Sequence, residues 1–457
     1  MKRNSLSVVL IVFLLFTSVG LSGASGNKTI GVNVLLNTDI TDAILTELGT
    51  HGKVRDVVYE VDALTMQIRS SELGAIQSLP YVAAANPDAE RNGAPVDTVA
   101  VSDFMNGLST WDQDAINVTD FDFNNRQVVY DGTGVYVAVL DTGLVDSWRQ
   151  YFPQERIAEE YGIAFGGGGG EVGTVSSQPN KWEHDQNSHG THVTSTILGY
   201  SLTGTPINGV APMATVIPVK VLNQNGSGWS SVIARGIVYV ADLKAGPLAG
   251  YPVVINMSLG GPVLDAVEKA AIDYAISKGV IIVASAGNNG TNGMGYPGAY
   301  APVISVAASG WVGEWSPAGN RSWWWNQNVA DPTNPADFYI TDFSSRELVG
   351  QDLDVAAPGS WVVGPYQVNS GQTSFYFLGG TSMASPHVAG IAALMMEKNP
   401  ALTQVQVEAI LESSAIFLAP GCRNVLGPTG VDETICWGAD ATGHGLTTAD
   451  GALTATP

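Results

Sequence analysis

Residues 135–141 read VYVAVLD, a run of apolar side chains that ends on one carboxylate, Asp141. The run does not alternate between apolar and polar residues, which predicts a strand buried on both faces, as in a parallel sheet. Together with four similar runs between helix-like segments, it predicts an α/β fold of three layers, with a mostly parallel central sheet flanked by helices. The other runs are ATVIPVKVL (214–222), VVINMSL (253–259), VIIVASAG (280–287) and VISVAAS (303–309).

Length and charge restrict the possible functions. The 457 residues can form one large domain and a small one. Asp and Glu number 42 against 20 Lys and Arg, which argues against nucleic acid or an anionic membrane as a partner. The only two cysteines, Cys422 and Cys436, exclude a four-cysteine zinc site and a disulfide framework.

The first 26 residues have the pattern of a secretory signal peptide. Lys2 and Arg3 precede an apolar stretch that ends near Val19, and small residues follow. A membrane anchor is the alternative, but it needs about 20 apolar residues. We therefore expect a secreted, extracellular protein, in which Cys422 and Cys436 can pair; two free buried thiols are the alternative.

A small unit precedes the large one. Residues 28–87 combine short β-type runs with helix-like stretches, which predicts an α+β domain, and the polar stretch DAERNGAPVD (88–97) reads as a linker. The expected domains are therefore 1–26, 27–97 and 98–457.

Three stretches interrupt the pattern of the large domain. Residues 166–170 are five glycines, which predict a flexible surface loop. Residues 418–443 hold both cysteines. Residues 311–336 are rich in tryptophan, which predicts a packed loop or an exposed patch that contacts substrate. The tryptophans are Trp311, Trp315, Trp323, Trp324 and Trp325.

The stretch GGTSMASPHVAG (379–390) carries the first chemical signal. Ser382 begins a helix-like segment, and a backbone N–H in a first helical turn has no intrahelical partner, so it can bind an oxyanion. We expect Pro386 in that same turn, where proline costs little. Thr403 and Gln406 form a capping-box pattern that opens the next helix.

A serine hydroxyl needs a neighbouring base. His189, in NSHGTHV, can stand at an exposed helix start, whereas His192 is expected to pack inside. Reading both as metal ligands is disfavoured, because no Glu lies between them. Asn288, in ASAGNNG, follows a predicted strand and is either a hydrogen-bond donor in the site or a turn asparagine.

Taken together, VLDTG, HGTH, SAGNNG and GTSMASPHVAG resemble the subtilisin-like serine proteases, the subtilases, from about Trp111 to the end of the chain. The family's order of Asp, His and Ser falls on Asp141, His189 and Ser382. The resemblance implies a serine endopeptidase that works through an acyl-enzyme, with Asn288 and the Ser382 amide binding the oxyanion. It also implies that residues 27–97 are an inhibitory propeptide, removed autocatalytically.

Other chemistries fit the motifs less well. Asp141-Thr142-Gly143 is also an aspartic protease motif, but that class needs a second such triplet or a dimer of much shorter chains. Related acid-active serine peptidases replace the histidine by Glu, and HGTH is intact here. A catalytically silent scaffold of the same fold would require a broken triad.

The resemblance has further implications. Protein or peptide substrates should add as a β-strand to two edges of the cleft, with a large apolar side chain before the scissile bond. Structural calcium is expected, with ligands unassigned because GYSLTGTPING (199–209) lacks carboxylates. An acidic cluster near residue 115 is interpreted as a solvated face. We expect a monomer whose own propeptide is its inhibitor, and a disulfide between Cys422 and Cys436. The edges are Gly226, Ser227 and Gly228, and Ser258, Leu259 and Gly260; the cluster is Asp112, Asp114, Asp120 and Asp122.

Overall fold

The computed structural model describes residues 27–101, 110–120, 125–166, 169–202, 204–315, 328–369 and 373–457. The expected signal peptide lies outside the described residues, as do Asp122, two of the five consecutive glycines, and Trp323, Trp324 and Trp325. None of the helices within these ranges combines the length and apolar character that a bilayer span requires.

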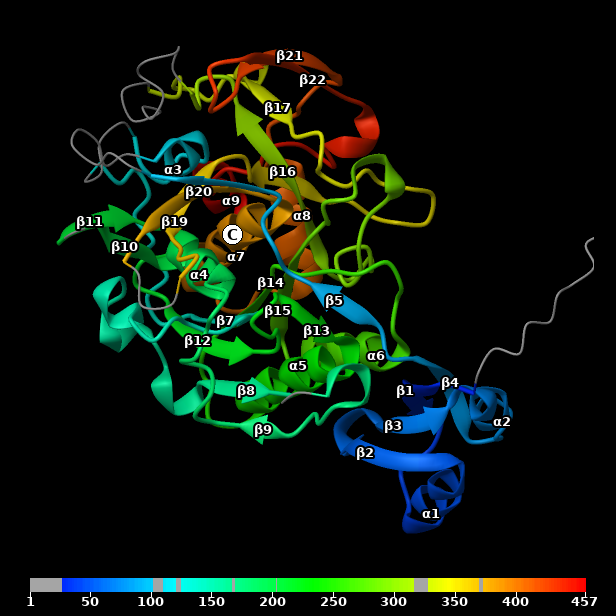
Figure 1. The fold of residues 1–457 in the computed structure, drawn as a ribbon. Helices are drawn as coiled ribbons and strands as arrows, with labels where there is room; N and C mark the ends of the chain where they lie inside the picture. Colours follow the sequence, from blue (N-terminus) through cyan, green and yellow to red (C-terminus); the bar gives the residue numbers. More distant parts are fainter. Residues whose placement is uncertain are drawn as a thin grey trace, which may run out of the picture.

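A small α+β unit begins the described chain, drawn in blue in Figure 1. Its antiparallel sheet has the order β2-β3-β1-β4. Val32, Leu64 and Met66 are fully buried between this sheet and two helices. The α+β pattern expected for this segment is therefore present. The elements are β1 (Thr29–Leu36), α1 (Asp42–His51), β2 (Gly52–Val58), β3 (Ala63–Arg69), α2 (Leu73–Gln77) and β4 (Val82–Pro87).

The large unit is built on one twisted sheet with the order β17-β16-β15-β14-β7-β12-β8-β9, and β18 also pairs with β16. The five apolar runs form β7, β12, β14, β15 and β16, whose mutual pairings are all parallel. Only the pairings of β17 and β9 are antiparallel among those described. The strands are β7 (Tyr136–Asp141), β8 (Ile163–Phe165), β9 (Ser177–Gln178), β12 (Thr215–Lys220), β14 (Val253–Met257), β15 (Val280–Ser285), β16 (Ile304–Trp311), β17 (Phe338–Ile340) and β18 (Val355–Pro358).

Successive side chains of these strands enter two different cores. Val137 and Val139 of β7 pack on the side of α4, α7, α8 and α9. Ala138 and Leu140 pack on the side of α5 and α6. The predicted three-layer α/β fold is thus confirmed, and Figure 1 shows helices on both faces of the sheet. The helices are α4 (His189–Leu198), α5 (Ser230–Ala245), α6 (Ala266–Ser277), α7 (Thr381–Lys398), α8 (Gln404–Ser414) and α9 (Ala449–Ala455).

Short elements complete the large unit. Strands β10 (Gly199–Leu202) and β11 (Thr205–Asn208) form a hairpin after α4, and β19 (Val362–Pro365) pairs with β20 (Phe375–Gly379). Helix α3 (Trp111–Ala115) brings Trp111 against the buried Trp311. Trp315 is also buried, so the packed-loop interpretation holds for the described part of the tryptophan-rich stretch. In the hairpin of β21 (Gly421–Leu426) and β22 (Asp432–Trp437), Cys422 and Cys436 lie opposite each other and are joined by a disulfide.

The segment between the two units crosses the large one as an added strand (Figure 1). Strand β5 (Glu90–Asn92) pairs antiparallel with β13 (Ser227–Trp229), and β6 (Asp97–Ala100) pairs antiparallel with β20. This segment therefore runs along the carboxyl end of the central sheet.

Candidate active site

Asp141 and His189 meet where β7 ends and α4 begins. The Nδ1 atom of His189 lies 2.8 Å from Oδ1 and 3.0 Å from Oδ2 of Asp141, and both side chains are fully buried. The backbone N–H of Thr142 also donates to Asp141, at 2.7 Å. This contact fixes the imidazole ring, and its Nε2 atom has no hydrogen-bond partner in the described part of the chain.

Two features bring α4 this close to the end of β7. A Cβ atom at Gly190 would clash with the carbonyl oxygen of Gly143, so only glycine allows the approach. The buried Asp185 accepts hydrogen bonds from the N–H groups of Asn187 and Ser188, each at 2.9 Å, and from Thr142 Oγ1 at 2.9 Å. Burial raises the pKa of Asp185 to about 6. Sequence reasoning missed Asp185, because no local motif marks a residue that supports two loops.

Ser382 is the second residue of α7, so its N–H has no intrahelical partner. Its hydroxyl donates to the carbonyl oxygen of Ser258, at 3.2 Å, rather than to His189. A Cβ atom at Gly93 would lie 2.7 Å from Ser258 O and 3.4 Å from His189 Cε1. The carbonyl group that Ser382 contacts and the imidazole ring of the base candidate therefore both lie close to Gly93.

The expected place of Pro386 is wrong. It is the sixth residue of α7, in the second turn and not the first. A proline there leaves the carbonyl four residues earlier, that of Ser382, without its helical partner. Ser258 Oγ compensates, because it donates to Ser382 O at 2.8 Å and also lies 2.8 Å from Ser385 Oγ. The missing helical bond is thus replaced by a tether between α7 and the segment after β14.

Asn288 follows β15 and faces α7. Its side-chain oxygen accepts from both the N–H and the hydroxyl of Thr381, at 2.9 and 2.8 Å. These bonds fix the amide plane and leave its NH₂ group for another acceptor. Asn288 and Ser382 both line a cavity of about 610 Å³, which has no charged side chain among its described lining residues.

The chain's own residues 90–96 occupy the cleft beside this cavity. Asn92 exchanges two hydrogen bonds with Gly260, of 2.9 and 3.0 Å, and Gly93 N donates to Gly226 O at 2.8 Å. Ala94 lines the cavity together with Ser382. Beyond it, Val96 N donates to Gly379 O at 2.7 Å. The segments predicted as substrate-binding edges, 226–228 and 258–260, thus both border an added extended strand.

The remaining buried histidines have other surroundings. His192 is fully buried with Nε2 3.2 Å from Val362 O, and burial, with a smaller effect from His189, lowers its pKa to about 3. It is therefore the neutral packed residue that was predicted. His387 Nε2 lies 3.0 Å from Asp112 Oδ2. Asp112 and Asp114 are 3% and 2% exposed, so the solvated-face interpretation is wrong for them, because α3 is packed into the large domain.

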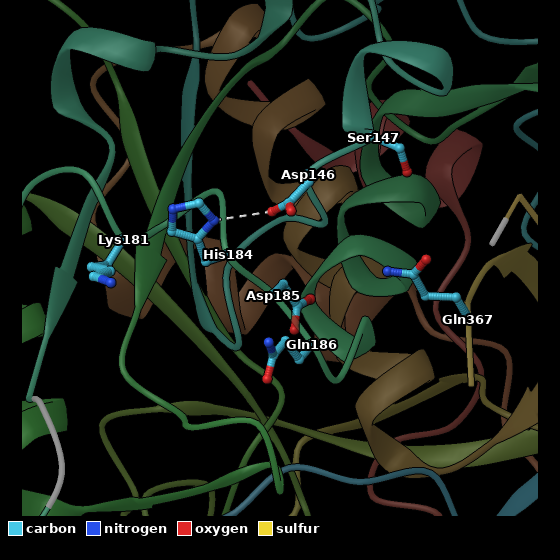
Figure 2. A pocket seen from close by; sticks show the side chains of 7 residues that line it. All are labelled: Asp146, Ser147, Lys181, His184, Asp185, Gln186 and Gln367. Atoms are coloured by element: carbon cyan, nitrogen blue, oxygen red, sulfur yellow. Dashed lines mark hydrogen bonds and ion pairs between the residues drawn. The ribbon is translucent and has the colours of Figure 1, made fainter. Parts of the chain in front are cut away.

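A second cavity, of about 370 Å³, lies beside the loop that precedes α4 (Figure 2). His184 Nδ1 lies 3.1 Å from Asp146 Oδ1 at its rim, and both side chains are exposed. Asp141, His189 and Ser382 do not line it. Asp185, which lines this cavity, connects it to the Asp141–His189 pair through Thr142 and Ser188.

Two groups of carboxylates have the chemistry of a calcium site. Within each group, one oxygen per residue lies within 4.8 Å of the others. The side-chain NH₂ group of Asn328 donates to Asp114 Oδ2 at 3.0 Å and to Asp120 Oδ1 at 3.2 Å. Oxygen-only ligands are those that Ca²⁺ prefers, so both groups fit this ion. The groups are Asp114, Asp120 and Asp331, and Asp354, Glu408 and Glu412.

Comparisons with known proteins agree with this geometry. Residues 132–438 match the Subtilase family. The chain is 36% identical over 293 residues to Subtilisin DY of Bacillus licheniformis, covering 63% of this chain and 86% of that relative. It is 30% identical over 366 residues to the "Thermostable alkaline protease" of Halalkalibacterium halodurans, covering 79% and 81%.

A solved structure extends the likeness to both units. Fervidolysin from Fervidobacterium pennivorans, described as a keratinolytic enzyme related to subtilisin, superimposes with a TM-score of 0.66 at 22% identity. The match covers 94% of this chain but 62% of fervidolysin, and at this identity it shows the fold alone.

Proposed function

Because this chain belongs to the subtilase family of serine endopeptidases, we propose that Asp141, His189 and Ser382 form its catalytic triad. The observation that carries the proposal is the buried Asp141–His189 contact, in which Nε2 of the imidazole has no hydrogen-bond partner among the described residues. For catalysis, the Ser382 hydroxyl turns from Ser258 O to His189 Nε2.

The reaction is acyl transfer. Ser382 Oγ attacks the peptide carbonyl while His189 takes its proton, and the C–N bond breaks as His189 returns that proton to the leaving amine. Water then hydrolyses the acyl-enzyme with His189 again as base. Asp141 stabilises the imidazolium, while the Asn288 NH₂ group and the Ser382 N–H bind the oxyanion. The N–H fits this role because it lies in the first turn of α7.

A serine-directed fluorophosphonate tests the proposal. Labelling of the matured enzyme should be lost in Ser382→Ala, together with all hydrolysis of unfolded casein. Labelling that persists in Ser382→Ala would overturn the assignment. A matured protein that neither labels nor cleaves casein would instead indicate a silent scaffold.

We also propose that the protein is secreted through residues 1–26 and matures by cutting itself. The hydrogen bonds of Asn92, Gly93 and Val96 support Ala94–Pro95 as the bond presented to Ser382. This position lies inside the expected propeptide, 27–97. Its carbonyl is the one that the oxyanion donors would face. The Ser382→Ala variant should therefore accumulate as the intact precursor.

Calcium is proposed as a structural ion, held by the carboxylates of Asp114, Asp120 and Asp331. Burial, followed by the nearby negative charges of Asp331, Asp120 and Asp112, raises the pKa of Asp114 to about 7, and a cation would relieve this repulsion. A chelator should lower the Tm of the Ser382→Ala precursor. An unchanged Tm with chelator would contradict the proposal.

A further inference from the structure

The cleft holds one charged side chain of the chain's own segment in a closed pocket. Arg91 lies on β5 opposite Gly228, and its side chain is fully buried. Its Nε donates to Glu268 Oε1 at 3.1 Å, and Nη2 bonds the other oxygen of the same carboxylate. Nη2 also donates to Val263 O at 2.9 Å, and Nη1 donates to Glu90 O at 3.0 Å.

The large domain supplies most of this pocket. Glu268 is fully buried on α6, and Arg91 is the only described residue whose side chain hydrogen-bonds its carboxylate. A Cβ atom at Gly261 would lie 2.8 Å from Arg91 Nη1, so the glycine leaves room for the guanidinium. Burial alone would lower the pKa of Arg91, but Glu268, with smaller effects from Asp265 and Asp88, raises it.

The position of Arg91 along the cleft indicates which residue of a substrate this pocket would bind. Arg91 is three residues before Ala94, whose side chain lines the cavity beside Ser382. It is therefore the fourth residue before the bond presented to the nucleophile. The backbone around it pairs with β13 and Gly260, the same edges that a substrate strand would use.

Resting on the proposed function, we propose that the matured enzyme selects substrates with arginine at the fourth residue before the scissile bond, and that Glu268 determines this specificity. Removal of the propeptide takes away the guanidinium and leaves the Glu268 carboxylate without its cation. A substrate arginine restores the bidentate pair, which a lysine ammonium cannot form in the same geometry.

Other side chains at this position are disfavoured by electrostatics. An apolar side chain would exclude water from the Glu268 carboxylate without supplying a positive charge, and an acidic side chain would add repulsion between like charges. Because binding at a remote subsite is expressed in the transition state, the preference should appear in kcat/KM.

The test compares four peptides that copy residues 91–94, acetyl-Xaa-Asn-Gly-Ala-p-nitroanilide, with Arg, Lys, Leu or Glu as the first residue. The matured wild-type enzyme should hydrolyse the Arg peptide with a kcat/KM about 10- to 100-fold above that of the Leu peptide, as expected for a charged hydrogen-bonded pair. The Lys peptide should fall between them and the Glu peptide should be the poorest.

Variants assign the preference to one carboxylate. Glu268→Gln should reduce the Arg-over-Leu ratio at least about tenfold, and Glu268→Leu should favour the Leu peptide. Asp273→Asn removes one negative charge from an exposed position of the same helix and should keep the ratio. If the Glu268 variants do not fold, the kcat/KM values of the wild-type enzyme for the four peptides still show whether arginine is preferred.

Two failures are distinguishable. Equal, fluorophosphonate-sensitive hydrolysis of the Arg and Leu peptides would overturn the specificity and leave the protease assignment intact. No Ser382-dependent hydrolysis of any peptide or of casein would overturn the proposed function, and this inference with it.

Discussion

The oxygen and the NH₂ group of the Asn288 side chain have different roles. The oxygen is bonded to Thr381, which orients the NH₂ group towards the cavity that Ser382 lines. A side chain held rigidly in this way can bind a developing oxyanion without reorganisation.

Asn288→Ala should therefore lower kcat about 10² to 10³-fold with little change in KM, the range established with subtilisin itself. Steady-state kinetics on one chromogenic peptide measures this loss. Asn424→Ala is the matched control. This residue lies on the β21–β22 hairpin and does not line the cavity beside Ser382, so the variant should retain wild-type kinetics. A kcat that stays within about twofold in Asn288→Ala would remove Asn288 from the proposed oxyanion site.

Glu314 is a buried acid outside the site. It accepts hydrogen bonds from Trp311 N, Tyr339 Oη and Ser360 Oγ, and burial raises its pKa to about 8. The folded state therefore keeps a proton that the unfolded state releases near the ordinary value of 4.5. The stabilisation is complete below pH 4.5 and is lost as pH rises towards 8.

Glu314→Gln should remove most of this pH dependence, because the amide is the isostere of the protonated acid. In the Ser382→Ala background, which removes the proposed nucleophile, unfolding free energies between pH 5 and 8 should fall by up to about 1.4 kcal/mol per pH unit more than in the Gln variant. Parallel curves for the two proteins would show that Glu314 titrates normally.

At the scale of elements, continuous apolar runs were sufficient to predict the strands that form the sheet. The run VYVAVLD contains β7, a strand that is covered on both faces. A strand of this kind has no alternation of apolar and polar residues, so a continuous apolar run in the sequence identifies it. Short motifs also identified the candidate residues Asp141, His189 and Ser382, since each occurs at the carboxyl end of a strand or the start of a helix.

Contacts between distant segments could not be predicted. The Arg91–Glu268 pair joins residues 177 positions apart, and neither residue has a local motif. The second-turn position of Pro386 was not predicted. The hydrogen bond that this proline removes is replaced by one from Ser258 to the carbonyl oxygen of Ser382, and these two residues are 124 positions apart in the sequence. Helix boundaries depend on such tertiary partners as well as on local propensity.

The extended segment that joins β5 to β6 places proline directly after Ala94. The ring carbon on the Pro95 nitrogen takes the place of an N–H and crowds the side from which His189, in its proposed role, would deliver a proton. Pro95→Ala should therefore accelerate self-processing at least about tenfold. Gel densitometry gives the rate, and mass spectrometry gives the new N-terminus.

Pro153→Ala, at an exposed position of the large unit, should process at the wild-type rate. If both variants mature equally fast, the conformation at Ala94–Pro95 does not limit processing. A new N-terminus several residues beyond Val96 would show that another bond is cut first.

At the scale of the whole molecule, the two units are joined by buried polar contacts as well as by the chain. Asp88, at the end of the small unit, accepts from Ser231 N at 3.0 Å and from Ser231 Oγ at 2.6 Å, at the start of α5. Asn33 Nδ2 donates to Asp265 Oδ2 at 2.8 Å, at the N-terminal cap of α6. Carboxylates at helix N-terminal ends are favoured by the helix dipole. Asp88, which belongs to the small unit, therefore stabilises the N-terminal end of α5 in the large domain.

This arrangement predicts that the proposed propeptide, once cut, remains bound and delays activity. Asp88→Asn removes a charged hydrogen-bond acceptor, which typically contributes about 1.5–3 kcal/mol, so propeptide release should be about 10- to 100-fold faster. The lag between cleavage on gels and the onset of peptide hydrolysis measures that release. Asp39→Asn removes an equal charge from an exposed position of the same unit and should keep the wild-type lag. If the two variants shorten the lag equally, net charge governs release; if neither does, the contact of Asp88 with α5 does not hold the two units together.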